Sequence, residues 1–574
     1  MSSTFLLLLT ACLPLHSTFA FPNGTGNTVM FAPFLEAPIS TIPSTFLSFN
    51  FDWNTNKTEN DAWTNASFGW TLDLNNPHLE ILASALAPAN LRVGGSAADV
   101  AEYSHGFPNG GRNCSDYALA NHFCLTPKRW DELVSFCQRT GLRLVFDLNI
   151  MLGRGDDGQN DWDSSNARAL LQYTVEHHQE WATRENLAFE LGNEKEFALS
   201  SLQAATSFLE LRNMLDTTFA ALSKNQRPML VGPSMNIRTD WLTNFLNHLQ
   251  SIAKAEGAAS DSPTLDVIAY HMYPGYGRSV NLPSLIMRPA WLDFTHSVAD
   301  QVRAAVLTSN SGVDLLSGTT ELWIDETAAA WASGTAGVCN GFLSGFWYLD
   351  QLASVMTKGH SAMCRQCLVG GNYSLIEQRE RKSAGGKKIP AWTPNPDWWT
   401  AWMWRTLVSG SSSSSGKEDI TVLAVNQVMP YEGDYVPEAR MYLVCTPKTS
   451  PHYRQGSVTS IWLNQDSNAT KSLIMYQRSR FNVRSDGYGL QLSDSPAVPP
   501  SFANLPRFQY IMESSDGNLL SRELQVNSML LSMLPGGKLP TFPIAEEAKV
   551  ENMVVPSDSY GFAIYPNANA SACM

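Results

Sequence analysis

Residues 187–194, LAFELGNE, form a short apolar run that ends in a carboxylate. Seven similar runs lie between about residues 46 and 408, and amphipathic stretches such as 164–181 and 201–223 separate them. Eight strand-like runs that alternate with helical patterns predict a (β/α)8 barrel, an α/β fold. In order, the runs are TFLSFNF (45–51), ANLRVGG (89–95), LRLVFDLN (142–149), LAFELGN (187–193), MLVGPS (229–234), LDVIAYHMY (265–273), ELWIDE (321–326) and AMCRQCLVGG (362–371).

The texture of the sequence changes after the serine-rich stretch at 409–416. Short β-branched or aromatic runs, such as ITVLAVNQV and YGFAIYP, follow one another between polar turns. This pattern predicts an antiparallel β-sandwich. We therefore expect a catalytic barrel over 46–408 and a sandwich domain over 409–574, with a segment at 21–45 that adds to the sandwich.

The first 20 residues have the features of a secretory signal peptide. An apolar stretch from Phe5 to Leu15 is followed by the small residues Thr18 and Ala20 before a plausible cleavage point. We expect a secreted glycoprotein, in the cell wall or a lytic compartment if not free outside the cell. Seven N-x-S/T sequons fit that expectation: Asn23, Asn56, Asn65, Asn113, Asn372, Asn468 and Asn569.

Composition narrows the class of partner. The chain has 574 residues, 44% of them hydrophobic, and a formal net charge of −14. This charge argues against nucleic acid and anionic membranes as partners. The sequence has no later apolar run of about 20 residues, so we expect no integral membrane segment. We expect a monomer.

Secretion permits disulfides, and eight cysteines remain after the predicted signal peptide. Cys114 and Cys124 are close enough in sequence to close a short loop, and Cys445 and Cys573 are candidates to fix the chain's end. Pairing does not follow from spacing alone. The other four have apolar neighbours and are candidate buried thiols: Cys137, Cys339, Cys364 and Cys367.

Two glutamates end the fourth and the seventh run. In such a barrel the carboxyl ends of the strands carry the chemistry. Glu194 and Glu326, 132 residues apart, would then face each other across one mouth. Two carboxylates beside a cleft suit glycoside hydrolysis, where one protonates the leaving oxygen and the other attacks the anomeric carbon. Asn193 is placed to bond a sugar 2-hydroxyl. We expect Glu190 to be buried in the strand and Glu196 to be solvated.

Several motifs, in one order over nearly the whole mature chain, resemble the heparanase-like proteins of glycoside hydrolase family 79, and the plant-type β-glucuronidases most of all. That resemblance implies a (β/α)8 barrel with a β-sandwich, and hydrolysis of β-linked glucuronic acid with retention. The motifs are LRVGGS (91–96), CLTPKRWDELVSF (124–136), FELGNE (189–194), LWIDET (322–327), FWYLDQLA (346–353), CRQCLVGGNYSLIE (364–377), NPDWW (395–399) and ASAC (570–573).

The resemblance also implies roles for individual residues. Glu194 would be the acid/base and Glu326 the nucleophile, with carboxyl groups about 5–5.5 Å apart. The remaining residues would bind or position the sugar: Asp52 and Ser96 at the barrel mouth, His271 or Tyr273 orienting Glu326, and Gln366 and Tyr373 in the glucuronate pocket. Tyr373 and backbone N–H groups would hold the glucuronate carboxylate. A core histidine at His271 and a strand-end cap at Asp52 are the alternatives.

The sequence departs from the family pattern in four places. Ala332 and Ser333 stand where many members have glycine, which crowds the approach to the substrate. Lys195 would favour an ionised Glu194 unless it points away. A glycan on Asn372 would block the pocket, so we expect that sequon to be empty. The basic loop 377–390 either grips an anionic glycan or is a solvated loop.

We therefore predict a secreted retaining glycosidase that releases β-linked glucuronic acid from glycans, proteoglycans or glucuronide conjugates. The alternatives are an endo-acting heparanase-like enzyme, another two-glutamate barrel glycosidase such as an arabinofuranosidase or xylosidase, and an inactive glycan-binding protein. We expect no cofactor and no metal, because the eleven histidines form no ligand motif. We expect an acidic pH optimum, because Glu194 must be protonated.

Overall fold

The computed structural model describes most of the chain. The described residues are 27–53, 72–104, 106–108, 124–155, 158, 160–255, 263–382, 386, 388–410, 418–428, 436–475, 481–483, 490–492, 505–548 and 552–574. The predicted signal peptide, Cys114 and four of the seven sequons (Asn23, Asn56, Asn65 and Asn113) lie outside this part of the chain. Among the residues described, no helix combines the length and the apolar character needed to cross a bilayer.

Eight parallel strands close into a barrel, which confirms the predicted fold class. Each strand lies within or overlaps one of the eight predicted runs. They are β3 (Leu47–Asp52), β4 (Asn90–Gly94), β7 (Arg143–Leu148), β8 (Leu187–Leu191), β9 (Met229–Met235), β10 (Val267–His271), β11 (Glu321–Thr327) and β12 (Ala362–Arg365). Side chains from six of the strands, including Val145, Val231 and Trp323, pack into one buried cluster. Such a filled interior leaves the strand ends as the place for a site.

Helices cover the barrel, and capping residues mark where the second main helix begins and ends. Thr126 caps the second main helix by accepting a hydrogen bond from the Arg129 N–H at 3.1 Å, and Gly141 ends that helix in the left-handed region at φ 72°. The larger helices are α1 (Pro77–Ser84), α2 (Pro127–Thr140), α3 (Ser165–His178), α4 (Ser201–Thr218), α5 (Thr239–Ala255), α7 (Pro289–Thr308), α9 (Ser344–Thr357) and α10 (Pro396–Trp404).

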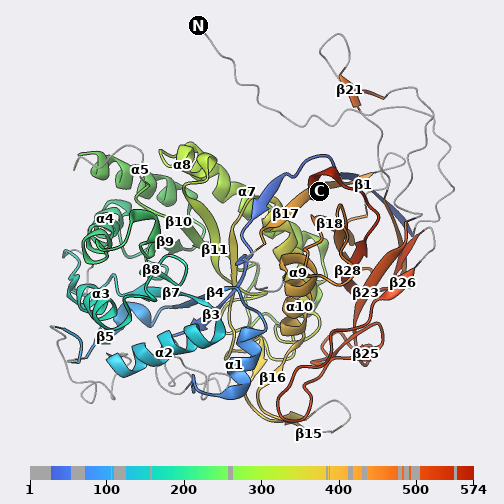
Figure 1. Cartoon of the computed structure of the whole chain (residues 1–574), viewed down its shortest axis with the longest axis horizontal. Coiled ribbons are helices and arrows are strands. Elements are labelled where there is room, and N and C mark those ends of the chain that lie inside the picture. Colours follow the sequence, from blue (N-terminus) through green and yellow to red (C-terminus); the bar gives the residue numbers. More distant parts are fainter. Residues whose placement is uncertain are drawn as a thin grey trace.

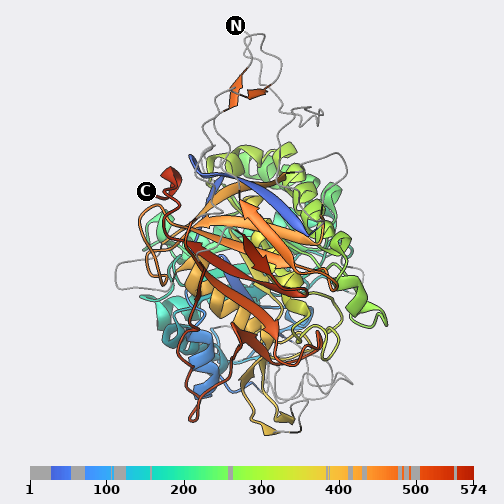
Figure 2. The same cartoon turned by 90° about the vertical axis from the view of Figure 1, so that its right-hand side faces the viewer.

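The second domain is rich in sheet and lies beside the barrel (Figures 1 and 2). Its strands follow the order β25-β24-β23-β28-β19-β18-β17-β1-β20-β27, with β2 on β17 and β26 on β23. The N-terminal strand β1 (Thr28–Phe34) pairs antiparallel with β17 (Ile420–Val428) and parallel with β20 (Lys471–Met475). The β1–β20 pair therefore departs from the purely antiparallel arrangement that the sequence predicted.

Nine further strands of the described residues belong to this sheet. They are β2 (Ser40–Ile42), β18 (Ala439–Cys445), β19 (Val458–Asn464), β23 (Arg507–Ser514), β24 (Leu524–Val526), β25 (Met529–Leu530), β26 (Glu546–Ala548), β27 (Met553–Val555) and β28 (Ser559–Tyr565). One buried cluster joins side chains of β1, β20 and β27 to side chains of β18, β19 and β28, among them Phe31, Leu473, Trp462 and Ala563. The two halves of the sheet thus share a core, as in a sandwich.

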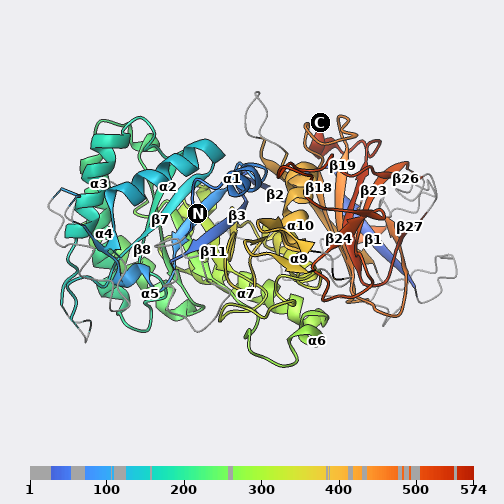
Figure 3. The ribbon, with the colours of Figure 1, turned by 90° about the horizontal axis from the view of Figure 1, so that it is seen from below.

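Helices α9 and α10 lie between the barrel and the sheet-rich domain (Figures 1 and 3). Every residue of α9 from Ser344 to Met356 is buried. A helix that is buried on all sides packs on two layers at once. This explains why FWYLDQLA is mostly apolar; its two polar side chains, Asp350 and Gln351, have hydrogen-bond partners in Tyr442 and Thr327.

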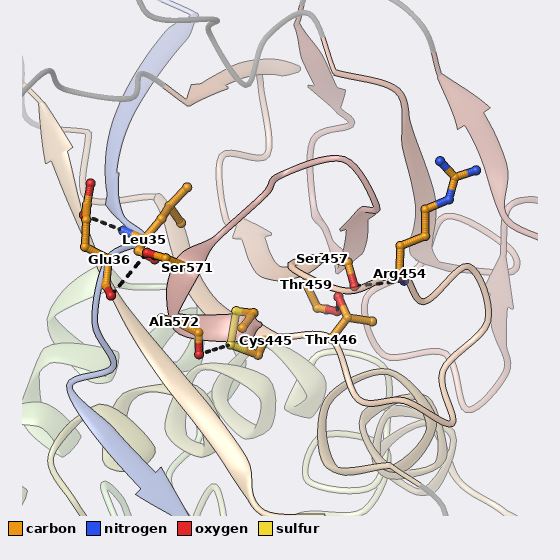
Figure 4. The surroundings of a disulfide bond; sticks show 10 residues. Leu35, Glu36, Cys445, Thr446, Arg454, Ser457, Thr459, Ser571 and Ala572 are labelled. Carbon is orange, nitrogen blue, oxygen red and sulfur yellow. Dashed lines mark hydrogen bonds between the residues drawn. A yellow bond between two sulfur atoms is a disulfide. The ribbon is translucent and has the colours of Figure 1, made fainter.

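A disulfide joins Cys445 at the end of β18 to Cys573 near the C-terminus, which confirms that predicted pair (Figure 4). The C-terminal residues also contact the chain just after β1, where the Ala572 N–H donates a hydrogen bond to the Leu35 carbonyl at 3.0 Å. Cys124 is also disulfide-bonded, and its predicted partner lies outside the described residues. The four predicted thiols, Cys137, Cys339, Cys364 and Cys367, are free and buried.

We expect Cys573→Ser to lower the free energy of unfolding by about 2–4 kcal/mol, because the bond closes a loop of 128 residues. Denaturant unfolding under non-reducing conditions measures this. The double variant Cys445→Ser/Cys573→Ser should lose no more than the single variant, since one bond is removed in both. Losses that add would show that the two side chains, rather than their bond, stabilise the domain.

Candidate active site

The two predicted catalytic glutamates lie at one mouth of the barrel. Glu326 belongs to β11, and Glu194 follows β8 by three residues. One carboxylate oxygen of each lies within 4.8 Å of the other. Both line a cavity of about 500 Å³. The other residues that line it are Asp52, Asn236, Ile237, His271, Tyr273, Trp331, Ala332, Ser333, Gln366 and Tyr373.

An unusual backbone conformation aims Glu194 into the cavity. Its φ is 56°, in the left-handed region, and its N–H donates to the Ser234 carbonyl at 2.9 Å. A non-glycine residue in this region is strained and is found where the surroundings require it, often at functional sites. The following residue, Lys195, turns to Asp99, with Nζ 3.0 Å from Oδ2. The lysine therefore contacts a different carboxylate from that of Glu194.

Both carboxylate oxygens of Glu326 accept hydrogen bonds. Arg92 Nη1 donates to Oε2 at 2.7 Å, and the Tyr273 hydroxyl donates to Oε1 at 2.6 Å. Two donors, one of them a buried cation, fix the orientation of this carboxyl group. Of the two predicted candidates, Tyr273 is thus the one that orients Glu326.

Arg92 is the central cation of the site, and it was missed by the sequence analysis. Its guanidinium also donates to Glu190 Oε2 at 2.7 Å and to Asn193 Oδ1 at 2.9 Å. Both Arg92 and Glu190 are almost fully buried. A planar fork of donors can hold several acceptors in fixed positions. An arginine inside the apolar run ANLRVGG was the available signal, because a buried cation needs partners.

We expect Arg92→Met to lower the free energy of unfolding by about 3–5 kcal/mol, because it leaves buried carboxylates without their cation. Urea unfolding measures the loss. Lys358→Met is the control: Lys358 pairs with Asp300 at 2.6 Å, and the two side chains are partly exposed, at 27% and 56%. Its loss should stay below about 1 kcal/mol. Equal losses in the two variants would contradict the role given to Arg92.

His271 bonds to the other glutamate. Its Nδ1 lies 2.9 Å from Glu194 Oε1, and the ring is buried. Burial opposes protonation of the ring, but the charges of Glu326 and Asp325 and the bond to Glu194 raise the pKa of His271 to about 9. For Glu194, burial acts to raise the pKa, but the bond and charge of His271 outweigh it and hold the pKa well below its usual range. The free site therefore keeps its proton on the imidazole.

Asp52, Gln366 and Tyr373 gather at one side of the cavity. Gln366 Nε2 donates to Asp52 Oδ2 at 2.6 Å. Burial and the charge of Glu326 raise the pKa of Asp52 to about 8, although Arg92 and Gln366 oppose the rise. Asp52 is thus a neutral acid at neutral pH, able to donate to a hydroxyl. Tyr373 is buried and lines the same cavity.

Two residues predicted to contact the sugar, Ser96 and Asn193, are not among the residues that line the cavity. Ser96 is exposed just beyond β4. Asn193 is buried, with Oδ1 taken by Arg92 and its N–H donating to Asp99 at 3.1 Å. The contacts of both residues with substrate stay predictions.

The prediction for Glu190 is confirmed and the one for Glu196 is wrong. Glu190 is buried on Arg92, and burial raises its pKa to about 7 while Arg92 opposes the rise. Glu196 is 2% exposed rather than solvated, and burial raises its pKa. Glu196 lies two residues after the left-handed turn at Glu194, and its side chain is buried although the next residue, Phe197, is 75% exposed. Asn236, which bonds to Glu194 and lines the cavity, was also missed.

Glu194, His271 and Glu326 each offer one ligand atom to a common point, so their spacing is compatible with a cation. A metal ligand must be a neutral imidazole with a free lone pair. The raised pKa of His271 and its bond to Glu194 favour the protonated ring instead. The expectation of a site without metal stays a prediction.

The described basic side chains of the loop 377–390 make contacts within the loop and with the sheet-rich domain. Arg379 Nε lies 3.2 Å from Glu377, and Arg381 Nη2 donates to the Arg522 carbonyl of the sheet-rich domain at 3.1 Å. Lys388 pairs with Glu380 at 2.8 Å on the surface. These contacts occupy three of its basic side chains within the protein, so binding of an anionic glycan here stays a prediction.

A family model described as "Glycosyl hydrolase family 79, N-terminal domain" matches residues 35–353. Heparanase-like protein 3 of Arabidopsis thaliana is 25% identical, covering 94% of this chain and 93% of its own. Baicalin-beta-D-glucuronidase of Scutellaria baicalensis is 24% identical, covering 94% and 92%. Heparanase of Gallus gallus is 26% identical, covering 94% and 95%.

Solved structures show the same fold at lower identity. A 4-O-alpha-L-rhamnosyl-beta-D-glucuronidase from Fusarium oxysporum superposes with a TM-score of 0.58 at 12% identity, covering 93% of this chain and all of its own. A family 51 arabinofuranosidase from Xanthomonas axonopodis superposes with a TM-score of 0.57, also at 12% identity, covering 94% and 99%. At this identity the likeness concerns the fold alone.

Proposed function

Because this chain belongs to glycosyl hydrolase family 79 and is a glycosidase of the glucuronidase and heparanase-like kind, we propose that it is a secreted retaining β-glucuronidase. The observation that carries the mechanism is the separation of the two glutamates, whose nearest oxygens lie within 4.8 Å. Retaining enzymes have carboxyl groups about 5–5.5 Å apart, whereas inverting enzymes leave room for a water at about 6.5–9.5 Å.

Each glutamate takes one role in a double displacement. Glu326, ionised and held by Arg92 and Tyr273, attacks the anomeric carbon and forms a glycosyl-enzyme ester. Glu194 gives a proton to the departing oxygen. It then removes a proton from the water that attacks the ester, and Glu326 leaves with its original charge. The proton for the first step comes from the Glu194–His271 pair.

The glucuronate carboxylate is assigned to the end of the cavity formed by Tyr373, Ala332 and Ser333. The Tyr373 hydroxyl and the backbone N–H groups of the turn are donors fixed before the substrate arrives. Fixed donors suit a carboxylate, since they need no reorganisation on binding. Asp52 and Gln366 are assigned to the sugar hydroxyls.

The proposed substrates are glycans, proteoglycans and small glucuronides. An endo-acting heparanase-like activity is the second candidate function. The names of the heparanases and of the baicalin glucuronidase, all similar over most of the chain, support both. Both glutamates and their partners are in place, which disfavours an inactive binding protein. Location outside the cell and a monomeric state belong to the same proposal.

Hydrolysis of p-nitrophenyl β-D-glucuronide by the purified protein tests the proposal, with the matching arabinofuranoside and xyloside beside it. We expect release from the glucuronide alone, and ¹H NMR should show the β anomer of free glucuronate first. Release only from heparan-type or arabinogalactan chains would favour the endo-acting candidate. Preferred release from the arabinofuranoside or xyloside would reject the uronate pocket, and α product would reject retention.

A further inference from the structure

Residues Trp331 to Gly334 form a tight turn at the edge of the catalytic cavity. Ala332 and Ser333, its two central residues, have φ values of 57° and 63°. The Gly334 N–H points back to the Trp331 carbonyl at 3.4 Å. This is the pattern of a type I′ turn, which requires the left-handed region at both central positions and therefore favours Gly, Asn or Asp. Alanine and serine are strained there.

The surroundings hold this turn in place on several sides. The Asn372 N–H donates to the Ser333 carbonyl at 2.7 Å, and the Gly277 N–H donates to the Trp331 carbonyl at 3.0 Å. Gly334 packs so closely that a Cβ there would lie 3.0 Å from the Tyr373 ring. A conformation fixed in this way does not relax when its side chains become larger.

The Ala332 and Ser333 side chains therefore narrow the cavity, which both residues line. They do so beside Tyr373, at the end assigned above to the glucuronate carboxylate. Glycine at these two positions would supply the same N–H donors without backbone strain. The strained backbone therefore points to a role for the Ala332 and Ser333 side chains that is separate from N–H donation.

We infer that the Ala332 and Ser333 side chains form a steric filter at the site of the uronate carboxyl group. This filter admits the free acid and rejects derivatives with a larger carboxyl substituent, such as the methyl ester. This inference rests on the proposed function. One extra methyl group in a fixed pocket changes specificity by about 10-fold to 200-fold. The loss of negative charge in the ester adds a separate penalty, which substitutions of the two side chains leave unchanged.

The chain contains a matched control for the strain. Asn527 and Ser528 join β24 to β25 by a two-residue hairpin turn, with φ values of 48° and 65°. This is the same turn type, in the sheet-rich domain, with serine at the same position as Ser333. Ser528→Gly thus removes the same strain as Ser333→Gly away from the cavity.

The experiment compares kcat/KM for p-nitrophenyl β-D-glucuronide and for its methyl ester, together with the Tm. In Ala332→Gly/Ser333→Gly we expect the preference for the free acid to fall at least about tenfold. The Tm should stay equal or rise, as in Ser528→Gly, which should keep the wild-type preference. Ser333→Ala, which keeps the Cβ, should keep most of it.

The outcomes separate the two proposals. An unchanged preference in the double glycine variant of an active enzyme overturns the filter and leaves the proposed function intact. A fall in Ser333→Ala as large as in the double glycine variant overturns the steric basis, since only the hydroxyl is then needed. A folded wild type that hydrolyses neither compound overturns the proposed function, and the filter with it.

Discussion

Glu326→Gln is expected to lower kcat for glucuronide hydrolysis by about 10³-fold or more, while the protein stays folded. An amide cannot form the glycosyl ester, and it cannot accept from both Arg92 and Tyr273 through two charged oxygens. Initial rates with p-nitrophenyl β-D-glucuronide measure the loss. Circular dichroism and Tm show whether the fold survives.

Glu321→Gln provides the matched control for this substitution. Glu321 begins the same strand and accepts from Trp323 Nε1 at 2.8 Å, but it lies at the opposite end of the barrel. Its variant should keep at least about half of the wild-type rate, because it does not reach the cavity. In addition, a 2-fluoro glucuronide should label the wild-type peptide that contains Glu326. More than a tenth of the activity in Glu326→Gln, or a label on another peptide, would reject it as the nucleophile.

Local patterns predicted the barrel because each strand and helix is encoded by a short stretch. The eight apolar runs and their spacing specify the strands, and the carboxyl ends of parallel strands must meet at one face. Glu194 and Glu326 therefore come together across 132 residues without any knowledge of their contacts. The pairing of Cys445 with Cys573 is different, since eight cysteines permit many pairings and spacing does not choose among them.

The parts of the site that were missed depend on contacts distant in sequence. Arg92 bonds to Glu326 across 234 residues, and nothing in its own run shows that partner. Glu196 looks solvated because it sits among charged residues. The left-handed backbone at Glu194, which turns it inward, is not favoured by the residue type. The division of roles between His271 and Tyr273 likewise follows from side-chain directions at the end of β10 and just beyond it, which no strand pattern predicts. Both residues line the cavity, but His271 contacts Glu194 and Tyr273 contacts Glu326.

The sequence could not show which side chain carries the proton for the acid/base step. A glutamic acid was expected to hold it, which implied an acidic optimum. In the folded protein burial alone would favour that, but the histidine bond and charge reverse it. The Glu194–His271 pair holds one proton, which is lost as pH rises through the pKa of His271, about 9. The basic limb of kcat/KM should therefore report the pair rather than a lone carboxyl group.

We expect His271→Gln to move this basic limb to lower pH by about two units or more. Glutamine keeps a hydrogen bond to Glu194 but carries no proton reserve, so Glu194 must then hold the catalytic proton itself. Without the imidazolium, the pKa of Glu194 rises, yet it remains below the value of about 9 that His271 gives the pair. Activity is thus lost earlier as pH rises. Profiles of kcat/KM between about pH 4 and 10 test the shift, because this range covers the pKa values of a carboxyl group and of a histidine whose pKa is raised.

His296→Gln is the control for a histidine in contact with a buried carboxylate. His296 Nε2 of α7 lies 3.2 Å from Asp350 of α9 and 3.3 Å from the Tyr442 hydroxyl of the sheet-rich domain, and His296 does not line the cavity. Its variant should keep the wild-type basic limb even if its Tm falls. If His271→Gln and wild type share one basic limb, Glu194 holds the proton alone. The strained turn at Glu194 then serves to aim a carboxylic acid, and His271 is the satisfied core histidine that the sequence left as its alternative.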